Sequence, residues 1–166
     1  SSRARNTLAQ NVASANGDGF KIDGDSNTFR DNESRFNTEN GFDVNGTENV
    51  LSRNVAADNG DDGFDLDGER NRLTRNEAHK NGAIGEPGNR NGFHVSNDFN
   101  ALTGNVATEN AEFGFVIDDG IFGNSITNRN ISELNGSTDM HDLNAECSSN
   151  RWRQNIFGTS DPGCID

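Results

Sequence analysis

Apolar and polar residues alternate in short stretches that return along the chain at nearly constant intervals. Five of these stretches read GFKIDG, GFDVNG, GFDLDG, GFHVSN and GFVIDD, starting at Gly19, Gly41, Gly63, Gly92 and Gly114. In each, the phenylalanine and the apolar residue two positions later share one face, because successive side chains of a strand point to opposite faces. The alternation therefore predicts short β-strands that each bury one face.

A second motif, Asn-x-Leu-x-x-Asn, recurs between these strands, with Phe or Trp replacing Leu in two copies and a distorted copy, NSITNRN, at Asn124. Its seven copies begin at Asn6, Asn27, Asn49, Asn71, Asn100, Asn124 and Asn150. The intervals between them are 21, 22, 22, 29, 24 and 26 residues, so insertions lengthen a basic repeat of about 22. A period of this size indicates a solenoid.

One coil of this length cannot bury its own apolar face, whereas coils stacked about 4.8 Å apart bury Phe on Phe and Leu on Leu. The fold class that we predict is all-β, a right-handed parallel β-helix of about seven coils with two or three strands each. Asparagines that recur at the corners are expected to form hydrogen-bonded ladders rather than a binding motif. The two rows run through Asn11, Asn32, Asn54, Asn76 and Asn105, and through Asn16, Asn37, Asn59, Asn81 and Asn110.

Only 30% of the 166 residues are hydrophobic, a composition typical of disorder, but the regular period argues against disorder. No linker divides the chain, so we expect a single domain over 1–166, with repeat coils over 1–138 and a capping coil over 139–166. The net charge of −13 would repel nucleic acid and anionic bilayers, and no apolar run approaches the length of a membrane span. Neither partner is therefore expected.

The two cysteines, Cys147 and Cys164, lie 17 positions apart near the C-terminus. A disulfide between them would contribute roughly 3 kcal/mol to stability, and we favour it over two unpaired thiols. No CxxC metal or redox pair is present.

The Asn-rich coils resemble the parallel β-helix repeats of the pectate-lyase-like superfamily, including NosD-like bacterial proteins, over nearly the whole chain. The ending STDMHDLNAECSSNRWRQNIFGTSDPGCID is similar to the closing segment of secreted actinobacterial β-helix proteins, where a cysteine pair brackets an Asn-x-Trp-x-x-Asn coil. The resemblance implies a secreted, extracellular bacterial protein in which Trp152, Asp139 and Asp142 help to cap the last coil. Because repeat material begins within a few residues of Ser1, we expect the C-terminal part of a longer protein. Its uncapped first coil would stack on another chain or oligomerise.

The outward positions of the Phe strands form two mostly acidic rows. The first contains Lys21, Asp43, Asp65, His94, Val116 and His141, and the second contains Asp23, Asn45, Asp67, Ser96 and Asp118. Carboxylates on adjacent rungs lie roughly 5 Å apart and alternate positions on one strand roughly 7 Å apart, separations that bracket those of glycoside hydrolysis. In the superfamily that the repeats resemble, this face commonly holds an extended polysaccharide.

The candidate catalytic residues on this face are His94, Asp65, Asp67 and Asp43. His94 lies beside Asp65 of the previous rung, an arrangement that would raise the pKa of His94 or orient it as a general base. The candidate substrate-binding residues are Lys21, Glu86, Arg90 and Asp118. Glu86 and Arg90 belong to the largest break in the repeat, and inserted loops of solenoids often lie on the binding face. The alternative is a solvated acidic face that serves solubility.

The carboxylates of Asp43, Asp65 and Asp67 are also candidate Ca²⁺ ligands, because hard cations bind several oxygen ligands. The spacing matches neither an EF-hand loop nor the nine-residue calcium repeat, so the motif is weak. No cofactor other than this Ca²⁺ is expected.

The sequence thus favours a carbohydrate-active domain that binds or acts on an extracellular polysaccharide, as a polysaccharide lyase, an epimerase or a glycoside hydrolase. The GHG and RIK motifs of polygalacturonase-like hydrolases are absent. Two rival hypotheses remain: a noncatalytic structural or adhesive solenoid, and a C-terminal fragment whose active site lies in missing N-terminal coils.

Overall fold

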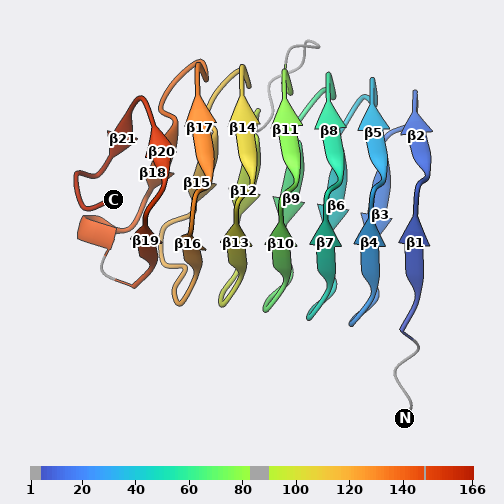
Figure 1. Ribbon diagram of the computed structural model, residues 1–166, viewed down its shortest axis with the longest axis horizontal. Coiled ribbons are helices and arrows are strands. Elements are labelled where there is room, and N and C mark those ends of the chain that lie inside the picture. The colour runs from blue at the N-terminus through green and yellow to red at the C-terminus, as the bar shows by residue number, and fades with distance from the viewer. Residues whose placement is uncertain (1–4, 83–89, 148) are drawn as a thin grey trace.

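The computed structural model describes residues 5–82, 90–147 and 149–166. The chain winds into a right-handed β-helix whose coils follow one another along the long axis, from the N-terminal coil to the C-terminal coil (Figure 1). All paired strands are parallel and form three sheets of seven strands, which confirms the predicted fold class and number of coils. Among the described residues the only helical element is a short 3₁₀ turn, η1 (Ala145–Cys147).

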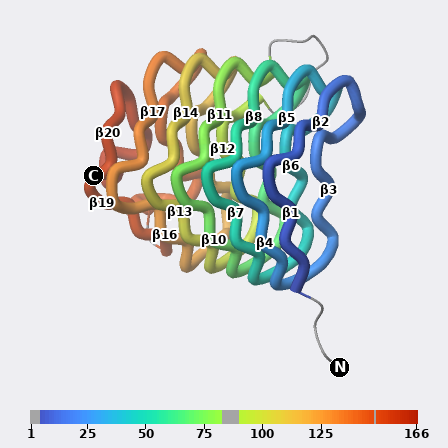
Figure 2. The backbone as a smooth tube through the Cα atoms, turned by 45° about the vertical axis from the view of Figure 1, so that its right-hand side comes forward, coloured from blue at the N-terminus to red at the C-terminus, as the bar shows by residue number. Residues whose placement is uncertain are grey.

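Each coil contributes one strand to each sheet in turn, so neighbours within a sheet come from successive coils (Figure 2). Sheet A contains β1 (Thr7–Ala9), β4 (Thr28–Arg30), β7 (Val50–Ser52), β10 (Arg72–Thr74), β13 (Ala101–Thr103), β16 (Ser125–Thr127) and β19 (Arg151–Arg153). Sheet B contains β2 (Val12–Ser14), β5 (Glu33–Arg35), β8 (Val55–Ala57), β11 (Glu77–His79), β14 (Val106–Thr108), β17 (Ile131–Glu133) and β20 (Ile156–Phe157). Sheet C contains β3 (Phe20–Ile22), β6 (Phe42–Val44), β9 (Phe64–Leu66), β12 (Phe93–Val95), β15 (Phe115–Ile117), β18 (Met140–Asp142) and β21 (Ser160–Asp161).

The centre of the core is a column of phenylalanine rings from sheet C. Phe20, Phe42, Phe64, Phe93 and Phe115 stack with neighbouring centroids 4.6 to 4.8 Å apart and interplanar angles of 10° or less. The parallel register that aligns these rings also aligns every outward residue of the sheet from rung to rung. The core therefore decides which side chains meet on the surface.

The asparagine ladders are confirmed at the corners between the sheets. At the corner between sheets A and B, the backbone N–H and the Nδ2 of Asn54 both donate to Oδ1 of Asn76, over 2.9 and 3.0 Å. Asn59 donates to Asn81 in the same way at the corner between sheets B and C. Because these amides satisfy one another and nearby carbonyl groups, they stabilise the stack and are not free to bind a ligand.

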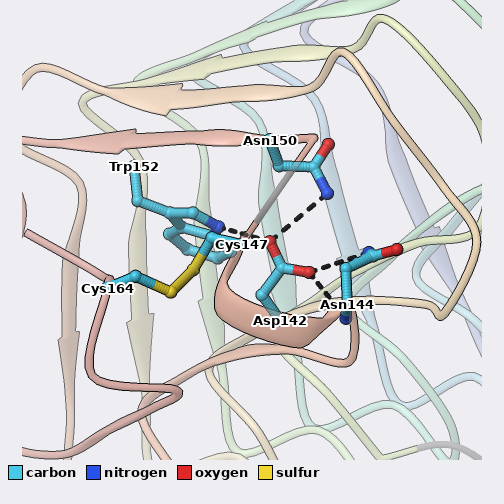
Figure 3. The surroundings of a disulfide bond; sticks show 6 residues. All are labelled: Asp142, Asn144, Cys147, Asn150, Trp152 and Cys164. Atoms are coloured by element: carbon cyan, nitrogen blue, oxygen red, sulfur yellow. Dashed lines mark hydrogen bonds between the residues drawn. A yellow bond between two sulfur atoms is a disulfide. The ribbon is translucent and has the colours of Figure 1, made fainter.

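The last coil is fixed by the Cys147–Cys164 disulfide, which confirms the favoured pairing, and by a buried carboxylate (Figure 3). Oδ2 of Asp142 accepts hydrogen bonds from Trp152 Nε1 and Asn150 Nδ2, over 2.8 and 3.3 Å. Oδ1 of the same carboxylate accepts the backbone N–H and the Nδ2 of Asn144. Both oxygens have partners, so Asp142 acts as an anchor for the closing coil.

No helix in the described part of the chain is long and apolar enough to cross a membrane.

Candidate functional site

The register of sheet C places the first predicted row in line along the outside of the solenoid. Asp43 lies opposite Lys21 and Asp65, and His94 lies opposite Asp65 and Val116. These residues sit at the middle position of three-residue strands whose outer positions fill the core. The alternation that buries Phe and Leu is thus what turns Asp65 and His94 outward.

His94 lies at the centre of a cluster of three carboxylates. Its Nδ1 is 3.0 Å from Oδ1 of Asp65 and 3.3 Å from Oδ2 of Asp62, and its Nε2 is 3.1 Å from Oδ1 of Asp118. Although the strand turns it outward, His94 is only 8% exposed, because these neighbours cover it. The ring is held on both nitrogens and is fixed in orientation.

The charges around His94 determine its protonation. Burial by itself lowers the pKa of His94, but hydrogen bonds to Asp118, Asp62 and Asp65 outweigh it and raise the pKa to about 12. At neutral pH the ring is therefore an imidazolium with two N–H donors and no lone pair for accepting a proton. His94 acts as the cation that holds the carboxylates together.

Asp62 is the member of this cluster that the two predicted rows missed. It is 1% exposed, and burial raises its pKa to about 6, against hydrogen bonding from His94. Its Oδ1 accepts a hydrogen bond from the backbone N–H of Asn91 at 2.6 Å. The single hydrogen on Nδ1 of His94 points to Asp65, whose Oδ1 is the nearer acceptor at 3.0 Å. Asp62 Oδ2 is therefore the more distant of the two carboxylate oxygens that face Nδ1, at 3.3 Å.

A repeat signal for Asp62 is present in the sequence. The residue before each Gly-Phe pair alternates between Asp and Asn on four rungs, Asp18, Asn40, Asp62 and Asn91. In the structure these side chains form a third ladder, in which each Oδ1 accepts the backbone N–H of the next rung. From this corner position the Asp62 side chain reaches His94 of sheet C. The alternation of apolar and polar residues within the strands does not predict this contact.

The predicted acids beside His94 also come together. One carboxylate oxygen from each of Asp43, Asp65 and Asp67 lies within 4.8 Å of the others, an arrangement that could hold a divalent cation. The Asp43 carboxylate contacts Nζ of Lys21 and accepts Nδ2 of Asn45 at 3.0 Å, and Asp67 accepts the hydroxyl of Ser96. Asp65 contacts His94, so all three acids have other partners, and no cofactor is established by the group.

The remaining candidates lie at the edges of this face. Lys21 is two rungs from Asp65 and reaches it only through Asp43. Arg90 is exposed. Burial raises the pKa of Asp61, and the positive charge of Arg90 partly offsets this increase. Glu86 lies outside the described residues.

The profile of a protein family described as "Right handed beta helix region" matches residues 2–149. The chain belongs to this family. No curated protein matches it in sequence.

Two solved structures show how this member of the right-handed β-helix family relates to larger relatives. The periplasmic alginate epimerase AlgG superposes with a TM-score of 0.71 at 21% identity, over 90% of this chain and 39% of the epimerase. The pectate lyase Pel9A superposes with a TM-score of 0.60 at 19% identity, over 96% of this chain and 48% of the lyase. At these identities the likeness shows the shared fold, and the chain spans less than half the length of either enzyme.

Proposed function

We propose that this protein binds an extended extracellular polysaccharide along the outward face of sheet C and transfers protons at His94 and Asp65. The observation that carries the proposal is the cluster of one imidazolium and three carboxylates in the middle of a row of polar side chains. The cluster lies outside the phenylalanine column and the asparagine ladders, which run through the coils independently of it. Two proteins of the same fold, an alginate epimerase and a pectate lyase, are named for polysaccharides, which supports the substrate class.

The electrostatics define the roles. His94 is charged and donates on both nitrogens, so it supplies a proton or neutralises an anion, while Asp65 supplies the base. A cation beside a carboxylate base serves a lyase or epimerase that removes a proton next to a uronate carboxylate. An acid and a carboxylate on one face serve a glycoside hydrolase. The disulfide supports a secreted location, because such bonds persist in oxidising compartments.

A noncatalytic polysaccharide-binding role for the same face is the second candidate. It is favoured by the engagement of both ring nitrogens of His94 inside the protein and by the low exposure of His94. In that case Lys21 of the first row and Asn45 and Ser96 of the second row would provide hydrogen bonds to sugar hydroxyls without turnover.

The test is a panel of uronate, neutral and amino-sugar polysaccharides, each with Ca²⁺ and with a chelator. Reducing ends report hydrolysis, absorbance of the unsaturated product reports a lyase, and NMR reports epimerisation. We expect Asp65→Asn and His94→Gln to lower turnover about 10²- to 10⁴-fold, as the loss of a general acid or base does. His79→Gln is the matched control, because His79 lies on sheet B, away from this face.

Unchanged turnover in both variants would contradict the assignment of the site. Binding without turnover by the wild-type protein would select the noncatalytic role. Turnover that a chelator abolishes and Ca²⁺ restores would assign calcium to Asp43, Asp65 and Asp67.

A further inference from the structure

Sheet A presents a surface of opposite character to sheet C. Its strands read TLA, TFR, VLS, RLT, ALT, SIT and RWR, in which the middle residue is inward and neither outward position ever carries a carboxylate. With the corner that follows each strand, this face holds seven of the 14 basic residues and a single acid, Asp31. A chain of net charge −13 therefore gathers half of its cations on one of its three faces.

Most of these arginines have no acidic partner. Asp31 pairs with Arg53, at 2.7 Å, and with Arg30, at 3.3 Å. The five others make no ion pair with any described residue and are exposed: Arg72, Arg75, Arg129, Arg151 and Arg153. Charges farther away than about 8 Å are screened at physiological ionic strength, so the local sign of this surface decides what it attracts.

A column of hydroxyl groups runs between the arginines. The register aligns Ser52, Thr74, Thr103 and Thr127 on four successive rungs. Beside the column, at the corner toward sheet B, an open hollow of about 290 Å³ is lined by Arg53, Asn54, Val55, Arg75 and Glu77. Each of these arginines precedes a corner asparagine and has a left-handed φ, which places its side chain at the edge of sheet A.

We infer that sheet A is a second polysaccharide-binding surface, which binds a linear polyuronate lengthwise through the unpaired arginines and the hydroxyl column. A polyuronate carries one carboxylate on each sugar, and a guanidinium binds a carboxylate through two parallel hydrogen bonds. From Arg72 to Arg151 the face extends over three rungs, roughly 14 Å, so several sugars are engaged at once. The surface is separate from sheet C and does not depend on turnover there.

The chemistry of this face favours a polyuronate over a nucleic acid. Proteins that bind single strands stack bases on aromatic side chains, and no outward position of sheet A is aromatic. Hydroxyl groups in a row match sugar hydroxyls between carboxylates. The arginines and the hydroxyls together therefore fit a chain whose charge and hydroxyl groups alternate.

The experiment titrates a fluorescently labelled oligogalacturonate into the purified chain and follows anisotropy at two salt concentrations. We expect the double variant Arg72→Ser/Arg75→Ser to bind about tenfold or more weakly, as loss of charged hydrogen bonds predicts. The matched control is Arg35→Ser on sheet B, where Arg35 already contacts Glu33. Its affinity should be unchanged, and added salt should weaken binding by the wild-type protein more than binding by the double variant.

Thermal melts of both variants verify that the fold is intact, which we expect because Arg72 and Arg75 are exposed and Arg35 is only half-buried. Turnover separates this inference from the proposed function: Asp65→Asn should lower turnover at sheet C, whereas the loss of affinity in Arg72→Ser/Arg75→Ser is measured without turnover. Equal affinity of the double variant and the wild type would overturn the inference. Binding of duplex DNA through the same arginines without binding of the oligogalacturonate would also overturn it.

Discussion

Sheets C and A are made by the same coils and have the same register, yet they handle charge in opposite ways. On the face of sheet C, three charged side chains, His94 and two near it, are buried: Asp62 is 1% exposed, Asp43 6% and His94 8%. On sheet A the arginines are exposed, and most have no acidic partner among the residues that the structure describes. Because the scaffold is fixed by its inward residues, the outward positions of each sheet can acquire a chemistry of their own.

The contrast has an energetic side. A buried charge stabilises a fold only when its partners remain, and removal of one partner leaves the others uncompensated. An exposed charge is solvated with or without a partner and contributes little. Substitutions on the two faces should therefore differ in stability before they differ in function.

The largest effect is expected from His94→Ala. This change leaves Asp62 and Asp65 without their shared cation and should lower the free energy of unfolding by about 3–5 kcal/mol. Arg72→Ala on sheet A should leave the urea midpoint unchanged, because Arg72 is exposed and has no acidic partner among the described residues. Similar losses in both variants would remove the distinction between the faces.

An intermediate effect is expected from pH. The folded pKa of His94 is raised to about 12, above an unfolded value of about 6.5, so its contribution is complete below about pH 6.5 and declines as pH rises toward 12. Between pH 7.5 and 9.5 the unfolding free energy should therefore fall steadily, by roughly 1 kcal/mol per pH unit. Burial raises the pKa of Asp62 to about 6, so Asp62 titrates below this window.

Urea unfolding at three pH values measures this slope, and His94→Gln provides the reference. The variant should have a shallower dependence over the same window. A wild-type protein whose stability is flat from pH 7.5 to 9.5 would show that His94 is not held as a cation.

The smallest effect is expected from Thr103→Asp, which gives sheet A one carboxylate. Thr103 is half-buried on the outer side of its strand, so stability should change by no more than about 0.5 kcal/mol. The new charge lies one rung from Thr74 and Thr127 and should weaken oligogalacturonate binding several-fold by repulsion. Stronger binding would contradict the assignment of sheet A as a polyanion surface.

Much of the fold could be read from single positions of the repeat. Phe64 and Phe93 are 29 residues apart, but each opens the same alternating stretch, and the structure stacks their rings. Asn54 and Asn76 likewise occupy one repeat position and form a ladder bond. Such contacts follow from the period, because a parallel stack places equivalent residues on top of one another.

The site was harder to predict because its contacts join different repeat positions. Asp65 lies in the row of His94, and that neighbour was expected. Asp62 reaches His94 from a corner, and Asp118 reaches it from beyond the end of the next strand. The direction of a side chain at a corner depends on local backbone angles, and the alternation of apolar residues does not encode these angles.

The sequence by itself determined the solenoid, its core and ladders, and the rows of outward residues, because each depends on a period that is visible in the chain. Only the tertiary structure decided that His94 is enclosed by three carboxylates and that five arginines have no acidic partner within the described part of the chain. The physical reason is that charge pairing depends on distances of a few ångströms between neighbouring coils and corners. Those distances are set by the stacking of the coils rather than by the repeat that produces it.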